Sequence, residues 1–264
     1  MLAKVISGAN VGLDSTAVTI EVDIASQGLP SFTLVGLADR AVEESRERVR
    51  SALKNSGADF PAKRITVNLA PADFPKEGPA FDLPIAIGLL LASEQLVTDL
   101  SDSLMIGELS LDGSLRSTKG VLSFAILAKN MGLKRIFVPK DNALEAAVVE
   151  DLEVYPFENL LEVFKFLTGS IKISPQPTTN LALEDGIIYE YDFKDIKGQE
   201  QAKRALEIAA AGGHNVLMKG PPGAGKTLLA RTLPSILPRP TFEEAVEITK
   251  VYSISGLLED SIMI

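Results

Sequence analysis

The chain has 264 residues, of which 46% are hydrophobic and 23% are charged, so it can bury sizeable cores and lacks the composition of a disordered protein. The absence of cysteine excludes disulfides and thiolate metal sites, and the single histidine leaves few imidazole ligands. The formal net charge of −9 neither supports nor excludes nucleic-acid binding. The longest apolar stretch, residues 83–92, is about half as long as a membrane span, and the N-terminus lacks the features of a secretion signal. We therefore expect a cytoplasmic protein with no membrane partner.

Residues 1–170 predict an α/β domain, because strand-like and helix-like segments alternate along them. Residues 17–24 alternate apolar and polar side chains with the two-residue period of a strand, and residues 32–35 predict its neighbour. Helical periodicity follows over residues 38–57. Further strands are expected at 65–70, 104–109, 135–139 and 152–156, and further helices at 84–96, 121–130, 142–150 and 159–167.

Several charged residues of this domain are interpreted as architecture. Asp82 is expected to cap the helix that follows it, and Lys76 and Glu77 are expected to lie in a solvated turn. Arginines alternate with glutamates in the first helix, a pattern that predicts exposed ion pairs on the helix surface for Arg46, Arg48 and Arg50.

A linker is predicted over residues 171–190, where the stretch ISPQPTTN has two prolines and no apolar period. A second domain is predicted from residue 191 to residue 264. It begins with a helix over 199–211 that ends at two glycines, and HNVLMKG at 214–220 then predicts a short buried strand. The segment FEEAVEITK predicts a short helix whose glutamates form a solvated face.

The segment GPPGAGKT matches the phosphate-binding pattern G-x-x-x-x-G-K-[ST] at every required position, between a predicted strand and a predicted helix. Its glycines let the backbone curl so that N–H groups face phosphate oxygens. Lys226 would reach the β and γ phosphates, and the hydroxyl of Thr227 would coordinate magnesium. The predicted cofactors are thus ATP and Mg²⁺, with Thr227 as the metal ligand. The predicted binding residues are Gly220, Pro221, Pro222, Gly223, Ala224, Gly225, Lys226 and Thr227.

Hydrolysis of a bound nucleotide needs more than this loop. It requires an acidic residue at the end of another apolar strand, a group that orients water, and often an arginine from a neighbouring subunit. Residues 228–264 offer no such strand, and residues 257–260 come nearest to one. The sequence therefore assigns no complete catalytic set and leaves open whether the chain is an enzyme.

The stretch DFKDIKGQEQAKRALEIAAAGGHNVLMKGPPGAGKTLLAR resembles the start of the ATPase domain of magnesium-chelatase-like AAA+ proteins of the YifB/ComM type. The stretches SFTLVGLAD, ITVNLAPADFPKEGPAFDLPIAIGLL and LMIGELSLDGSLR are similar to the N-terminal domain of the same family. The resemblance implies a ring-forming homo-oligomer that uses ATP, with DNA branch migration as its candidate work and DNA as a candidate partner. Members are roughly twice as long, so the resemblance also implies a truncated P-loop AAA+ domain.

The N-terminal domain is in addition similar to the proteolytic domain of Lon proteases, a ribosomal S5 domain 2-like fold. Those proteases use a serine nucleophile in a G-P-S-A-G loop and a lysine base on the next helix. Here the loop reads PKEGPAFD, with Ala80 at the serine position, and alignment by glycines places Leu122 at the lysine position. The resemblance therefore implies a catalytically silent domain. Two alternatives stay open, namely a protease with a displaced dyad of Lys119 and Ser123, and a non-catalytic interaction module with a vestigial phosphate loop.

Overall fold

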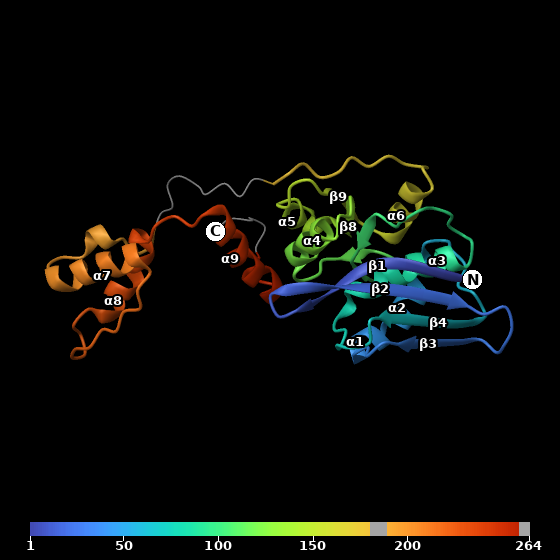
Figure 1. Ribbon diagram of the computed structural model, residues 1–264, viewed down its shortest axis with the longest axis horizontal. Helices are drawn as coiled ribbons and strands as arrows, with labels where there is room; N and C mark the ends of the chain where they lie inside the picture. Colours follow the sequence, from blue (N-terminus) through green and yellow to red (C-terminus); the bar gives the residue numbers. More distant parts are fainter. Residues whose placement is uncertain (180–188, 259–264) are drawn as a thin grey trace. The chain divides into compact units, whose positions relative to one another are not determined.

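The computed structural model describes residues 1–179 and 189–258 (Figure 1). By their internal contacts the described residues form two compact units, the first containing residues 1–179 and 247–258 and the second containing residues 189–246. The linker predicted over 171–190 lies partly outside the described residues. None of the described helices is long and apolar enough to cross a membrane.

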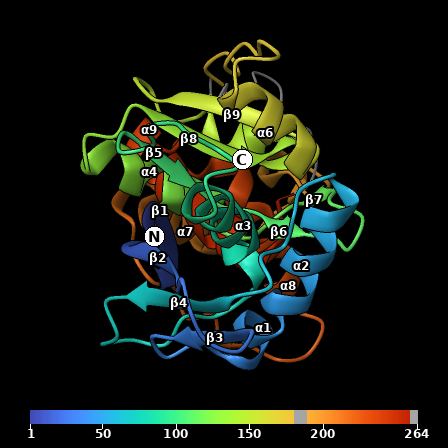
Figure 2. The same cartoon turned by 90° about the vertical axis from the view of Figure 1, so that its right-hand side faces the viewer.

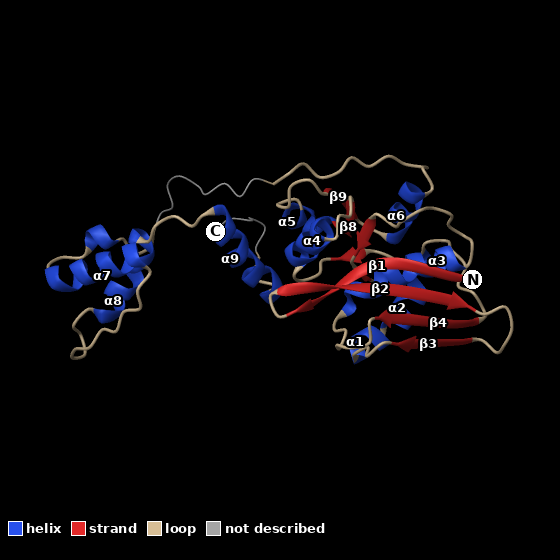
Figure 3. Ribbon diagram, in the orientation of Figure 1, coloured by secondary structure: helices blue, strands red, loops and turns tan. Residues whose placement is uncertain are grey.

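A seven-stranded mixed sheet forms the body of the first unit (Figure 3). The strands lie in the order β3-β4-β2-β1-β5-β8-β9, and only the pairs β1/β2 and β2/β4 are antiparallel. A mostly parallel sheet with helices on its faces confirms the predicted α/β class. The strands are β1 Leu2–Val11, β2 Asp14–Ile24, β3 Ser31–Val35, β4 Arg64–Ala70, β5 Ser103–Met105, β8 Arg135–Pro139 and β9 Glu153–Phe157, with β6 Glu108–Leu109 and β7 Leu115–Arg116 forming a separate two-stranded ribbon.

Helices cover both faces of this sheet, because successive side chains of a strand point to opposite faces. Helices α2 and α3 lie on one side of the sheet and α4 lies on the other (Figure 2). Phe137 of β8 belongs to the core that contains residues of α2 and α3, whereas its neighbours Ile136 and Val138 belong to the core that contains residues of α4 and α5. The apolar helix α3 is the most deeply buried, as predicted for residues 84–96. The helices are α1 Arg40–Glu43, α2 Ser45–Asn55, α3 Asp82–Ala92, α4 Val121–Asn130, α5 Ala143–Ala146 and α6 Leu160–Leu167.

The first unit departs from the sequence prediction at several elements. The strand predicted over 104–109 is divided into β5 and β6 of different sheets, and β3 pairs with β4 rather than with its predicted neighbour β2. Strand β1 was not predicted, because LAKVISGANV mixes small and polar residues without a clean alternation, yet it pairs with β2 over its whole length. The helix predicted over 38–57 is divided at Glu44 into α1 and α2. The helix predicted over 142–150 is only α5, preceded by a 3₁₀ turn at Lys140–Asn142.

The second unit consists of helices around a small apolar cluster of Ile196, Leu206 and Leu229. The strand predicted at 214–220 is wrong, because these residues have no regular structure and Leu217 is 95% exposed. A strand requires a neighbour for its backbone hydrogen bonds, and no other strand lies among the described residues of this unit. The helical elements are η3 Phe193–Asp195, α7 Glu200–Gly212, α8 Lys226–Thr232 and η4 Leu233–Ile236, and α9 Phe242–Ser255 begins in this unit.

Helix α9 is longer than the predicted segment 242–250, and its first three glutamates are exposed as expected. Its C-terminal part belongs by contacts to the first unit rather than to the domain predicted from residue 191. There Lys250 Nζ lies 2.6 Å from Asp14 Oδ1, and the Ser253 hydroxyl donates to Glu145 Oε1.

Candidate phosphate-binding site

The loop GPPGAGKT lies directly before helix α8 in the second unit. Gly223 and Gly225 have φ angles of 79° and 81°, in the left-handed region that residues other than glycine rarely adopt. A Cβ added at either glycine would meet no atom within 4 Å. Backbone conformation, rather than crowding, therefore requires glycine at these two positions.

Lys226 is the first residue of α8, and its ammonium is held inside this loop. Its Nζ donates to the carbonyl oxygens of Gly220 and Pro221, each at 2.8 Å. From the other side of the loop, Gln199 Nε2 donates to Ala224 O at 3.2 Å. A fixed positive charge thus lies among backbone groups, while the Thr227 side chain next to it is exposed.

These residues fit a nucleoside triphosphate with magnesium. The first N–H groups of a helix have no intrahelical acceptor, so those at the start of α8 are free to bind phosphate oxygens. Mg²⁺ in such sites takes one or two protein ligands and completes its shell with phosphate oxygens and water. The single hydroxyl of Thr227 is sufficient for that role.

The segment before α7 is joined by hydrogen bonds to α8 and to the 3₁₀ turn η4 that follows it. Arg231 NH1 donates to the Tyr191 hydroxyl at 3.1 Å, and the guanidinium carbon lies 5.2 Å from the centre of that ring. Phe193 N donates to Ser235 Oγ at 2.9 Å. These contacts support α8 and hence the end of the loop that α8 carries.

The protease-like loop of the first unit carries no nucleophile. Ala80 lies in the 3₁₀ turn Pro79–Phe81, and Leu122 is a buried apolar residue of α4. Ser123, half of the alternative displaced dyad with the exposed Lys119, is 2% exposed and donates its hydroxyl proton to Leu13 O at 3.0 Å. A buried hydroxyl whose proton is already bound has no approach to a substrate carbonyl, so the geometry gives the displaced dyad no support.

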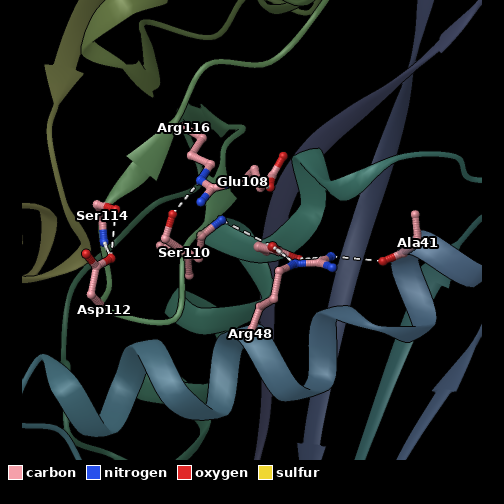
Figure 4. Close-up of polar contacts among 9 residues, drawn as sticks. Ala41, Arg48, Glu108, Ser110, Asp112, Ser114 and Arg116 are labelled. Carbon is pink, nitrogen blue, oxygen red and sulfur yellow. Dashed lines mark hydrogen bonds and ion pairs between the residues drawn. The ribbon is translucent and has the colours of Figure 1, made fainter.

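The sequence predicted that Asp82 caps the helix that follows it. In the structure this helix has no side-chain cap, and Asp82 forms a buried ion pair instead. Arg48 of α2 donates from Nε to Asp82 Oδ2 at 2.6 Å and from NH2 to Oδ1 at 3.0 Å. Oδ2 also accepts from Leu109 N at 3.1 Å, and Arg48 reaches the carbonyl of Ala41 (Figure 4). Burial raises the pKa of Asp82 to about 6, against the opposing effect of Arg48. The predicted surface ion pair of Arg48 is therefore also wrong.

The prediction that Lys76 lies in a solvated turn is also wrong, because its side chain is fully buried. Its Nζ donates to Phe74 O at 2.8 Å and to Pro71 O, and it lies 3.9 Å from the centre of the Phe74 ring. Burial lowers the pKa of this ammonium. A lysine between Pro75 and Glu77 carries no sequence signal of burial, since its partners are backbone carbonyls that only the folded loop brings together.

Two family models match parts of this chain. Residues 20–142 match the family model described as subunit ChlI of Mg-chelatase, and residues 192–264 match the model described as magnesium chelatase, subunit ChlI. The chain belongs to this Mg-chelatase ChlI family, as the sequence motifs predicted.

Among its relatives, the competence protein ComM of Haemophilus influenzae is 48% identical over 258 residues, which cover 96% of this chain and 50% of ComM. YifB of Escherichia coli is 46% identical over 255 residues, 96% of this chain and 49% of YifB. The chain thus spans about half the length of these curated relatives. A Lon protease of Mycoplasma mobile is 25% identical over 176 residues, 62% of this chain and 21% of the protease, which agrees with the Lon-like similarity of the N-terminal domain.

Proposed function

We propose that the chain binds ATP together with Mg²⁺ through residues 220–227. The observation that carries this proposal is the placement of Lys226 at the start of α8, with its ammonium tied to two loop carbonyls between left-handed glycines. A loop held in this form before binding loses less conformational entropy when a phosphate enters it.

In this proposal each group has one role. The ammonium of Lys226 offsets the charge of the β and γ phosphates, and the loop N–H groups hold the phosphate oxygens. Thr227 supplies its hydroxyl to the magnesium ion. Neither role requires the hydrolysis machinery, so binding is proposed independently of turnover.

We propose further that residues 1–170 form a silent Lon-protease-like domain, and that residues 191–264 begin the AAA+ ATPase domain of a cytoplasmic ring-forming motor. Similarity over 96% of this chain to a protein named for competence supports DNA as the substrate of that motor. The rival function, an interaction module with a vestigial loop, predicts no nucleotide binding at all.

The magnesium role is tested by titrating a fluorescent ATP analogue into the chain with and without Mg²⁺. Thr227→Val keeps the size of the side chain and removes its hydroxyl, so we expect the Mg²⁺-dependent part of the affinity to fall by about tenfold. Thr178→Val, at an exposed threonine of the first unit, is the matched control and should bind the analogue as wild type does. A wild-type chain that binds no analogue in either condition contradicts the proposal and favours the interaction module.

A further inference from the structure

Only three charged side chains are buried in the part of the chain that the structure describes, and all three lie in the first unit. They are Lys76 and Asp82, each with no exposed surface, and Glu145, which is 7% exposed. Burying a charge is costly unless it is paired and hydrogen-bonded. All three brace the walls of one hollow of about 640 Å³ in this unit.

Lys76 fixes the first wall, the loop over residues 77–81. Its backbone forms a bridge to the segment before α1, with Lys76 N donating to Leu37 O at 2.9 Å and Asp39 N donating to Lys76 O at 3.0 Å. Asp39 Oδ2 then accepts from Gly78 N at 3.2 Å. With its side chain clamped to two carbonyls, Lys76 holds the loop that lines the hollow.

Asp82 and Glu145 fix the other walls. Through Leu109 N, Asp82 holds β6, where the neighbouring Glu108 faces the hollow. Glu145 accepts from Leu122 N at 2.8 Å and from Asn142 Nδ2 at 3.2 Å. Asn142 in turn holds both the N–H and the carbonyl of Thr118, each at 2.9 Å.

The hollow combines an apolar floor with an acidic rim. The floor consists of Pro79, Ala80 and Ile254, which are partly exposed, whereas the rings of Phe81 and Phe124 are almost fully buried. Gly8 leaves room for the Phe124 ring, because a Cβ there would lie 2.7 Å from it. Three carboxylates line the rim against the single ammonium of Lys119, and the hydroxyl of Thr118 is buried beside it with no hydrogen-bond partner. The carboxylates are those of Asp39, Glu77 and Glu108.

Two of these carboxylates have spare capacity for a ligand. Glu77 is exposed, and Glu108 has its nearest cation, Arg116 NH1, at 3.8 Å, which is a loose pair (Figure 4). Asp39 is occupied by the backbone N–H groups of Val42 and Gly78. A ligand that satisfies the rim therefore carries an ammonium or guanidinium group, and one that also covers the apolar floor carries apolar groups.

We infer that this hollow binds an extended peptide segment in which a lysine or arginine alternates with apolar residues, and that it holds the segment without cutting it. The Ala80 methyl beside the bound segment cannot attack a carbonyl, so no bond is made or broken. A polyamine shares the ammonium groups but leaves the apolar floor uncovered. This site is separate from the phosphate loop and does not depend on nucleotide binding.

The test is fluorescence anisotropy of a labelled peptide of about eight residues, alternating leucine with lysine and arginine, titrated with the 264-residue chain. A matched peptide has glutamate in place of each basic residue, and unlabelled spermidine serves as competitor. The variants are the double change Glu77→Gln with Glu108→Gln, the steric block Ala80→Trp, and the control Asp73→Asn, which removes an exposed charge outside the hollow from the same stretch of chain. Circular dichroism checks that each variant is folded.

We expect the basic peptide to bind and the acidic one not to bind, with affinity reduced about tenfold in the double variant and unchanged in Asp73→Asn. Ala80→Trp should weaken binding without a change of charge, and Lys226→Ala should leave it unaltered. Equal affinity for both peptides overturns the proposal. So do a loss in Asp73→Asn as large as in the double variant, full binding by Ala80→Trp, competition by spermidine at the peptide's own affinity, or cleavage of the peptide.

Discussion

Apolar side chains of strand-like segments are buried in the first unit and exposed in the second. In the first unit, strands β2 and β4 turn every second residue into a core between helices, and Val18, Ile20 and Val67 have no exposed surface. In the second unit, Val216 is 40% exposed and Leu217 is 95% exposed, although they belong to the most apolar stretch before the phosphate loop. Apolar sequence makes a buried strand only where neighbouring strands accept its hydrogen bonds.

Charged side chains show the reverse contrast. The first unit buries Lys76, Asp82 and Glu145, whereas the described ionisable residues of the second unit all stay at least partly exposed. Lys226 of the second unit, the proposed phosphate ligand, is partly exposed, while the buried charges of the first unit hold chain segments in place.

The largest effect is expected from Arg48→Ala. Removing the guanidinium leaves the carboxylate of Asp82 buried without its partner, so the free energy of unfolding should fall by about 3–5 kcal/mol. The matched control is Arg46→Ala on the same helix, whose side chain is 47% exposed, and which should cost about 0.5 kcal/mol or less. Urea unfolding followed by circular dichroism measures both, and equal losses would show that the ion pair has no structural role.

A smaller but sharper contrast compares two leucines. Leu53→Ala removes a fully buried side chain of α2 and should cost about 2–5 kcal/mol. Leu217→Ala should change the free energy of unfolding by less than about 0.5 kcal/mol, because that side chain contacts water. A large loss at Leu217 would mean that residues 214–220 pack in solution in a way that the structure does not show.

The smallest effect is a dependence on pH. The pKa of Asp82 is raised by burial to about 6, so the folded chain holds this proton where the unfolded chain has already released it. The contribution of Asp82 to stability is therefore greatest in acid and is lost as the pH rises from about 4 to about 6. Asp82→Asn should lack this loss, and thermal unfolding of the two proteins across that range checks it. Parallel curves would contradict a raised pKa.

Much of the fold follows from the sequence because periodicity is local. Residues 121–130 were predicted as a helix and form α4 with the same bounds, and the strand predicted at 135–139 is β8. Strand β1 was not predicted, because its side chains do not alternate between apolar and polar. It forms a strand through its backbone pairing with β2. The strand at 214–220 was predicted wrongly because its apolar side chains favour a strand but no strand among the described residues of this unit pairs with it.

The phosphate-binding role of residues 220–227 stays a prediction, which the sequence alone can make because the motif lies in eight consecutive residues. The roles of Lys76, Asp82 and Arg48 were not recognisable, since each depends on partners far along the chain or on backbone carbonyls. Arg48 and Asp82 are separated by 34 positions, and only packing of α2 on α3 brings them together. The hollow braced by the buried charges has no continuous motif in the sequence for the same reason.

The most direct test of the central proposal is equilibrium binding of ATP with Mg²⁺ to the wild-type chain, Lys226→Ala and Lys219→Ala, measured by isothermal titration calorimetry. Lys219 is exposed and lies immediately before the loop, so its removal changes the net charge equally without touching the loop carbonyls. Wild type and Lys219→Ala should bind, and Lys226→Ala should lose at least about tenfold in affinity. Equal binding by all three proteins, or no binding by wild type, would contradict a functional phosphate loop in this chain.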